Sequence, residues 1–380
     1  MEELKLNEKF SKTTLKHMVE FLMSAVTKGF KGKISDMTQY STNHRTTMGK
    51  FLNKYNWDTI VLDGIVKAKV IEYIIEKHQA EMKPIFVSID DTVCCKNKPS
   101  SKAKSPIEGT SHHYSHLLGK TVWGHQNIAI MLTCGEITLN FDIHQYDKTQ
   151  SKIEYIIEMA KQLPKCISSS YALMDSWFPC AEVIEAYEKQ GYYCIGGLKK
   201  NRIIYPNGTR ISIEQYAAEH LTIEDFNLVT VKSKKYYVHR YEGHLNGIPN
   251  AVVLISYPAD AFKNPKALKA FICTDVSLDT ETILTYYAER WCIETFFQQE
   301  KNSLGFDKYQ MRSIRGIKRF WLLTSLAHLM CCTAEYPAFK PFGEGLRNIR
   351  KSVKIDIITY IYNCSQDGVP LSVLIDEFAA

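Results

Sequence analysis

The sequence lacks several features that mark particular classes of protein. Its eleven cysteines form no Cys-x-x-Cys pair and no cysteine–histidine spacing of a zinc site. The N-terminus has no apolar signal core, and the longest apolar run, Phe320 to Cys332, is shorter than the ~20 residues that span a bilayer. There are no repeats or low-complexity tracts. We therefore expect a cytoplasmic protein with free thiols and no membrane partner.

The overall composition is that of a soluble globular protein with a mild excess of positive charge. Hydrophobic residues make up 45% of the 380 residues and charged residues 23%. At ~100–200 residues per domain, the length predicts two or three domains. The net charge of +6 and the pI near 8.6 permit nucleic-acid binding without requiring it.

The segment YAERWCIETFFQQEK, residues 287–301, carries the strongest pattern in the chain. A run without proline follows Pro265, and Asp279 or Thr280 is a plausible N-cap, so the pattern predicts a helix. At ~100° per residue, one helical stripe collects four polar residues: Tyr287, Arg290, Glu294 and Lys301. Taken alone, an Arg–Glu pair at this spacing is more often part of a solvated helix face.

Two upstream segments predict strands that end in aspartates. After Pro84, IFVSIDDTV is β-branched and ends in Asp90 and Asp91, whose side chains point to opposite faces of a sheet. A predicted hairpin, HQNIAIMLTCGEITLNFDIHQ, and a helix ended by Pro164 follow. SSYALMDSWFP is then a strand ending at Asp175, at the same sheet edge as the first strand. A helix cap is the alternative role for Asp175.

The spacing Tyr-x2-Arg-x3-Glu-x6-Lys resembles the signature of bacterial insertion-sequence transposases of the DDE type, which are RNase H-like polynucleotidyl transferases. The resemblance implies that Asp90, Asp175 and Glu294 are catalytic and hold metal. It selects Asp90 because Asp90-Asp91-Thr92 resembles the family's first Asp-x-Thr/Ser, although a one-residue error in register would exchange Asp90 for Asp91.

The implied chemistry is cleavage of transposon ends and their joining to target DNA. Hard carboxylate ligands suit two Mg²⁺ ions, with Mn²⁺ as a substitute. Beside them, residues at the same edge are expected to contact DNA phosphates: Tyr287, Arg290, Lys301, Lys199, Lys200 and Arg202. The loop histidines His112, His113 and His116 lack a fourth ligand, so we do not expect metal there.

These patterns predict an α/β fold, with an RNase H-like mixed sheet flanked by helices. We expect an N-terminal helical DNA-binding domain at 1–80, in which Arg45 and Lys50 contact DNA. The catalytic core spans 81–202 and 273–335, interrupted by a β-rich insertion at 203–272. Two short helices form the tail at 336–380. The insertion has no tryptophan, whereas some relatives use one to remodel a hairpinned DNA end.

The expected partners are the terminal inverted repeats of the transposon and the target DNA. Synapsis of two ends implies a homodimer on DNA, associated with the bacterial nucleoid. Two other functions keep the same fold: a catalytically silent, transposase-derived DNA-binding protein, and a metal-dependent nuclease that does not join ends. A tyrosine recombinase is disfavoured because no His-x-x-Arg element precedes a nucleophilic tyrosine.

Overall fold

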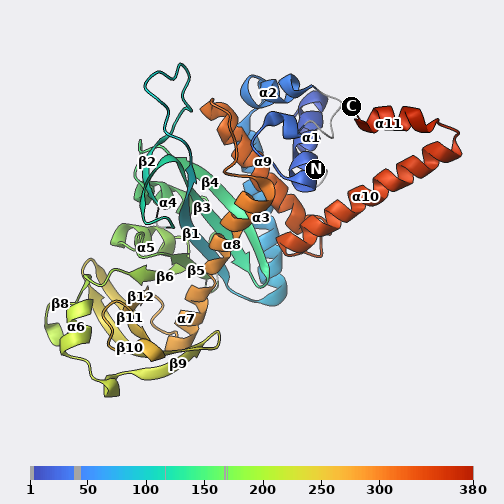
Figure 1. Cartoon of the computed structure of the whole chain (residues 1–380). Coiled ribbons are helices and arrows are strands. Elements are labelled where there is room, and N and C mark those ends of the chain that lie inside the picture. Colours follow the sequence, from blue (N-terminus) through green and yellow to red (C-terminus); the bar gives the residue numbers. More distant parts are fainter. Residues whose placement is uncertain (1–3, 38–43, 116, 167, 169, 380) are drawn as a thin grey trace.

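The molecule is built on one mixed sheet (Figure 1). The computed structural model describes residues 4–37, 44–115, 117–166, 168 and 170–379. Within them, twelve strands are joined by hydrogen bonds. The strands are β1 (Ile85–Cys95), β2 (Ser111–Ser115), β3 (Lys120–Cys134), β4 (Ile137–Tyr146), β5 (Ser170–Met174), β6 (Tyr192–Leu198), β7 (Ile203–Ile204), β8 (Ile211–Ser212), β9 (Asn227–Val231), β10 (Lys234–Leu245), β11 (Ile248–Pro258) and β12 (Lys269–Cys273).

Five of these strands form an RNase H-like core in the order β4-β3-β1-β5-β6. The hairpin β3–β4 lies antiparallel beside β1, whereas β5 and β6 run parallel to β1. The crossover from β4 to β5 contains a helix that begins with a capping box between Ser151 and Glu154. The predicted fold class is confirmed.

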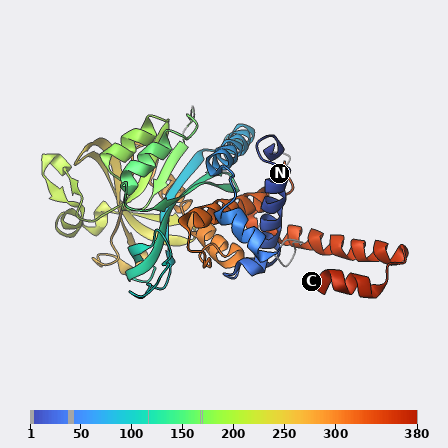
Figure 2. The same cartoon turned by 90° about the horizontal axis from the view of Figure 1, so that it is seen from above.

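The β-rich segment after β6 extends the sheet. Strand β12 pairs antiparallel with β6 and with β11, which in turn pairs with β10. The short strands β7 and β8 and the edge strand β9 complete this part. The insertion is therefore bonded edge to edge to the core (Figures 1 and 2).

Helices cover both faces of the core sheet. They are α1 (Lys12–Lys28), α2 (Arg45–Asn53), α3 (Thr59–Glu81), α4 (Lys152–Ala160), α5 (Ala181–Glu188), α6 (Ile213–Glu219), α7 (Thr280–Ala288), α8 (Trp291–Gln299), α9 (Ile314–Thr333), α10 (Phe342–Gln366) and α11 (Leu371–Ala379). Alternation along the strands separates two apolar clusters. One contains Ile128 and Ile156 of α4; the other contains Ala129 and Ile293 of α8. Hence α4 and α8 lie on opposite faces.

The N-terminal helices pack against the core through their apolar sides. In α2, Met48, Phe51 and Leu52 are fully buried, whereas Arg45 and Lys50 are exposed. His44 caps the helix by accepting a hydrogen bond from Thr46 N, 3.3 Å away. Of the residues predicted to open this helix, Thr42 and Asn43 lie outside the described residues.

The C-terminal segment differs from the two short helices predicted. Helix α10 is 25 residues long, and with α11 it forms an arm that projects from the body in both views (Figures 1 and 2). None of the described helices is long and apolar enough to cross a membrane.

Candidate active site

Asp90 and Asp175 lie side by side on neighbouring parallel strands, although β1 does not end at Asp90 and Asp91 as predicted but continues to Cys95. Ile89 of β1 lies opposite Met174 of β5, so the next residue on each strand is an aspartate. Asp175 ends β5 and its Oδ1 accepts a hydrogen bond from Trp177 N at 2.9 Å. Burial raises the pKa of Asp90 to about 7; the charge of Arg290 opposes this shift and that of Asp175 adds to it.

Strand alternation separates Asp90 from Asp91. Asp90 points to the face covered by α8, where Arg290 Nη1 donates to its Oδ2 at 2.8 Å. Asp91 points to the opposite face, where Lys152 Nζ lies 2.5 Å from Oδ2 and Gln126 Nε2 donates to Oδ1 at 2.7 Å. The structure therefore places Asp90, and not Asp91, beside the glutamate helix.

Arg290 joins the strand aspartate to the helix glutamate. Its Nη2 donates to Glu294 Oε1 at 2.6 Å, while Nη1 holds Asp90. Planar guanidinium groups suit two carboxylates at once, which a lysine ammonium does not reproduce. Asp90, Asp175 and Glu294, which are distant in sequence, thus surround one region on the α8 face of the sheet.

The segment predicted as one helix is divided in the structure. Helix α7 is capped by Asp279, as predicted, and ends at Ala288, before α8 begins at Trp291. At the junction, Arg290 N donates to Tyr287 O at 3.1 Å, a tight three-residue spacing. A π-helical turn, Glu300–Leu304, then follows α8. A prediction that assumes one helical period over the whole segment cannot detect the break between α7 and α8 or the π-helical turn.

Lys301 and Tyr287 border the carboxylates from either side. Lys301 Nζ donates to Thr92 Oγ1 at 2.6 Å; since Thr92 is two residues beyond Asp90, both lie on the same face of β1. The Tyr287 ring packs on Phe271, with centroids 4.8 Å apart. A Cβ at Gly197 of β6 would lie 3.3 Å from the Tyr287 hydroxyl, so a glycine there leaves room for the phenol.

The other basic residues proposed from the sequence occupy different surroundings. Lys199 and Arg202 line a cleft of about 320 Å³ with Trp177, next to Asp175. Lys200 instead donates to the Pro265 carbonyl at 2.7 Å and pairs with Glu214 at 3.4 Å, which ties it to the insertion. Arg45 and Lys50 lie on α2, away from the sheet (Figure 1).

Sequence reasoning did not single out Lys152 or Trp177 as parts of this region. Lys152 follows the helix-capping Ser151 and neutralises Asp91. Trp177, two residues after the second aspartate, is 44% exposed, an unusual exposure for so large an aromatic side chain. An aromatic residue just beyond a strand-ending aspartate is the signal that could have revealed it.

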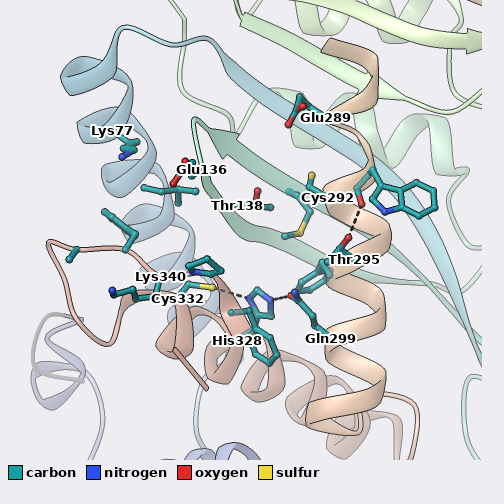
Figure 3. Close-up of a pocket in the computed structure, with 18 of the residues that line it drawn as sticks. Lys77, Glu136, Thr138, Glu289, Cys292, Thr295, Gln299, His328, Cys332 and Lys340 are labelled. Atoms are coloured by element: carbon teal, nitrogen blue, oxygen red, sulfur yellow. Dashed lines mark hydrogen bonds between the residues drawn. The ribbon is translucent and has the colours of Figure 1, made fainter. Parts of the chain in front are cut away.

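A larger cavity of about 730 Å³ lies on the other flank of α8 (Figure 3). Cys292, Thr295 and Gln299 of α8 line it, facing His328 of α9. His328 Nε2 lies 2.9 Å from Gln299 Oε1, and burial lowers the pKa of His328 to about 3. Since Asp90, Asp175 and Glu294 do not line this cavity, it is not the candidate active site.

The carboxylates suit a divalent cation by their chemistry. Asp90, Asp175 and Glu294 offer hard oxygen donors, and burial with a like charge disfavours ionised Asp90, a cost that a bound cation would relieve. Among the described residues, no three His, Cys, Asp or Glu side chains are grouped closely enough to hold a metal ion. The cation that bridges Asp90 and Glu294 here is Arg290.

Comparison with known proteins gives the family. Residues 81–330 match the family model of the transposase DDE domain, which covers more than half of the chain. The chain belongs to the DDE transposase family. The matched range of this DDE-family chain begins just before β1 and ends within α9, so it includes Asp90, Asp175, the insertion and Glu294.

Among solved structures, a cryo-EM structure of the piggyBac transposase synaptic complex with hairpin DNA is similar, with a TM-score of 0.45 and 11% identity. The similarity covers 97% of this chain and 76% of that chain. The search of curated proteins found no significant match.

Proposed function

We propose that this DDE-family chain is a DNA transposase of bacterial insertion-sequence type that cleaves transposon ends and joins them to target DNA. One observation carries the proposal: Asp90 within β1 and Asp175 just after β5 lie at the same level of adjacent parallel strands, and one guanidinium links Asp90 to Glu294. Three carboxylates on a rigid sheet and a helix packed against it suit phosphoryl transfer.

Asp90, Asp175 and Glu294 are the residues that would hold two divalent cations, Mg²⁺ or Mn²⁺. Such ions activate a water or a 3′-hydroxyl and stabilise the leaving oxygen in an in-line attack at phosphorus. Asp90 must be ionised to bind a cation, and its neighbours are arranged for that state: Asp91 N donates to its Oδ1 at 2.8 Å, and Arg290 to its Oδ2.

The remaining residues of the site would position the DNA backbone. If a metal cation bound Asp90 and Glu294, the planar N–H donors of Arg290 would be available to phosphate oxygens. Lys301, held against β1 by Thr92, presents a fixed positive charge on the same face as Asp90. Lys199 and Arg202 extend this charge past Trp177, and Tyr287 fixes the Arg290 side of the site.

The partners follow from the chemistry. We propose that the substrates are the terminal inverted repeats and a target duplex, and that two copies of the chain act together on DNA at the nucleoid. Arg45 and Lys50, exposed on α2, are proposed to contact the repeat outside the catalytic site.

The test is cleavage and strand transfer on linear DNA that carries the genomic sequence flanking the gene, with Mg²⁺. Glu294→Gln and Asp90→Asn should each lower both activities by more than about 100-fold while DNA binding persists. Thr285→Ala, at an exposed position of the neighbouring helix α7, is the control and should act like the wild type.

The rival functions give different outcomes. Binding of the ends with no cleavage in any metal would establish a silent DNA-binding protein. Cleavage without joining would establish a nuclease. Asp91→Asn should retain cleavage and strand transfer, because Asp91 faces Lys152 on the opposite side of the sheet from α8. If Asp91→Asn lost both activities while Asp90→Asn kept them, the assignment of Asp90 as the catalytic aspartate would be wrong.

A further inference from the structure

The hairpin of β2 and β3 ends in an uncovered apolar tip. Leu117 is 91% exposed, Leu118 is 50% exposed, and Tyr114 on β2 is 53% exposed. Gly119 takes φ +61° in the turn, and a Cβ placed there would meet no atom within 4 Å. Exposing the apolar surface of two adjacent leucines to water is unfavourable. Such an exposed apolar patch marks a site of interaction with another molecule.

The base of this hairpin is firmly held. The pairing of β2 with β3 runs from Ser111 and Gly124 to Ser115 and Lys120. The ring of His112 packs edge-on against Trp123 at 4.8 Å, and Lys148 Nζ donates to the His112 carbonyl at 2.9 Å. The tip is therefore carried on a supported strand pair.

The loop that leads into the hairpin is also anchored at its end. Glu108 N donates to Arg312 O at 2.9 Å, and Glu108 Oε2 accepts from Ile314 N at 2.8 Å. His125 Nε2 lies 2.8 Å from the Glu108 carbonyl. The carboxylate of Glu108 is thus hydrogen-bonded to the backbone at the start of α9.

Exposed lysines lie in the loop that precedes β2 and at the start of β3. Lys98, Lys102 and Lys104 are exposed in the preceding loop, and Lys120 is exposed at the start of β3. Between Lys96 and Glu108 the sequence contains no acidic residue. Lys98 Nζ lies 5.8 Å from the Trp123 ring, which places this charge beside the hairpin (Figure 1, β2 and the loop before it).

We propose that the β2–β3 hairpin is a DNA wedge, in which Leu117 and Leu118 enter between base pairs of a duplex. Lys120 and the lysines of the preceding loop, Lys98, Lys102 and Lys104, bind the phosphates of that duplex. Apolar side chains flanked by cations are the means by which proteins unstack and kink DNA. A protein partner fits less well, since the cores of protein interfaces are depleted in lysine. The proposal rests on the proposed function, which supplies the DNA.

Strand register gives the position of the wedge along the DNA. Ala129 of β3 lies opposite Asp90, and Lys120 is nine residues further toward the tip. At ~3.3 Å per residue this separation is about 30 Å. For a duplex that runs along β3, with ~3.4 Å per base pair, this distance corresponds to about nine base pairs between the wedge and Asp90.

The test uses the full-length protein without divalent metal and a set of flanking-sequence duplexes with 2-aminopurine at successive positions. The fluorescence of this base rises when it is unstacked. We expect a rise confined to steps about nine base pairs from the cut. Leu117→Ala with Leu118→Ala should abolish the rise, and Leu117→Met with Leu118→Met should keep it, because methionine also serves as a wedge.

Two controls separate the wedge from general effects. Leu228→Ala, at an exposed leucine of β9, should leave the signal unchanged. Lys102→Ala with Lys104→Ala should reduce the slope of log affinity against log salt by about 1.8, as expected for two lost phosphate contacts.

An unchanged signal in the double alanine variant, or no unstacking at any position, would overturn the wedge. Cleavage by the wild type with no unstacking would leave the proposed function standing. Unstacking that depends on the two leucines, with no cleavage in any metal, would support the wedge and defeat the transposase proposal.

Discussion

At the scale of single residues, Glu300 is the least expected side chain in the molecule. It begins the π-helical turn after α8 and is fully buried, and the Thr324 hydroxyl is the one hydrogen-bonding group among the described residues that opposes the effect of burial on its pKa. Burial raises the pKa of Glu300 to about 8. The folded protein therefore holds a neutral carboxylic acid at this position at neutral pH.

Glu300→Gln should increase the free energy of unfolding in a pH-dependent way. The folded-state pKa lies above the unfolded value, so the protonated form stabilises the fold at low pH, and this contribution is lost as pH rises from about 4.5 to about 8. Glutamine is never ionised, so the gain should be near zero at pH 4 and roughly 2–4 kcal/mol at pH 8. Urea unfolding at both values tests this; an equal gain at both would contradict it.

The aspartates show how far single residues can be predicted. The strand itself and the presence of two carboxylates on it follow from the β-branched run and from Asp90-Asp91, but its predicted end at these aspartates is wrong, because pairing with β3 carries β1 on to Cys95. Which one faces α8 depends on side-chain alternation relative to the partner elements. Lys152 on α4 and Arg290 before α8 decide it, and both are brought there only by the tertiary fold.

At the scale of elements, α10 packs against α9 through a glycine. A Cβ at Gly345 would overlap the Cys331 carbonyl oxygen, whereas a Cβ at Gly343 would meet only Arg347 Nη1 at 3.7 Å. Both glycines lie in the first turn of α10. Close backbone approach at Gly345 thus holds the root of the C-terminal arm against the core.

Gly345→Ala should destabilise the protein by about 1–3 kcal/mol, because the helices must separate or shift. Gly343→Ala is the matched control and should be neutral or stabilising by up to ~1 kcal/mol, as alanine favours a helix. Thermal unfolding of both variants measures the difference. Equal stability of the two would show that α10 does not pack on α9 in this way.

Helices and strands with a strong hydrophobic period were predicted well from the sequence. Those that form because of contacts with other parts of the chain were not. The hairpin β3–β4 and helix α4 match their patterns. Strand β2 was predicted as loop because His112 and His113 in a serine-rich segment give no apolar alternation; pairing with β3 creates it. The division between α7 and α8 arises from tight hydrogen bonds at Glu289 and Arg290 that have no sequence signal.

At the scale of the whole molecule, Arg319 fastens the N-terminal helices to the core. Its guanidinium is buried and donates to the carbonyls of Phe51, Leu52 and Tyr55 at 3.1, 3.2 and 2.8 Å, and to Trp57 O at 2.7 Å. From the sequence, the basic residues Arg312, Arg315, Lys318 and Arg319 ahead of an apolar helix predict either a phosphate-facing or a solvated start of α9. The structure shows instead that this arginine closes the end of α2.

Arg319→Met should lower the free energy of unfolding by roughly 2–5 kcal/mol, since four buried carbonyls lose a charged donor. Arg315→Met removes a single 3.2 Å bond to Tyr55 O at an exposed position and should cost under about 1 kcal/mol. Hydrogen exchange should show α2 as the first region released in Arg319→Met. Protection of α2 equal to that of the wild type would contradict this function of Arg319.

The joining of the insertion to the core also lay beyond sequence reasoning. Alternating runs predicted antiparallel strands, and these are present. That β12 would pair with β6 depends on which strand edge remains open after the core assembles. Nothing in the residues of either strand specifies its partner.

The unbroken sheet from β2 to β8 has a mechanical consequence for the proposed reaction. The hairpin, both aspartates and the insertion belong to one hydrogen-bonded framework, so a kinked duplex held against it must deform while the protein does not. Bending costs DNA about 1–6 kcal/mol. Cutting one strand lets that elastic energy relax, and resealing would require it to be supplied again. The stiffness of the sheet would therefore favour the cleaved state over the intact one.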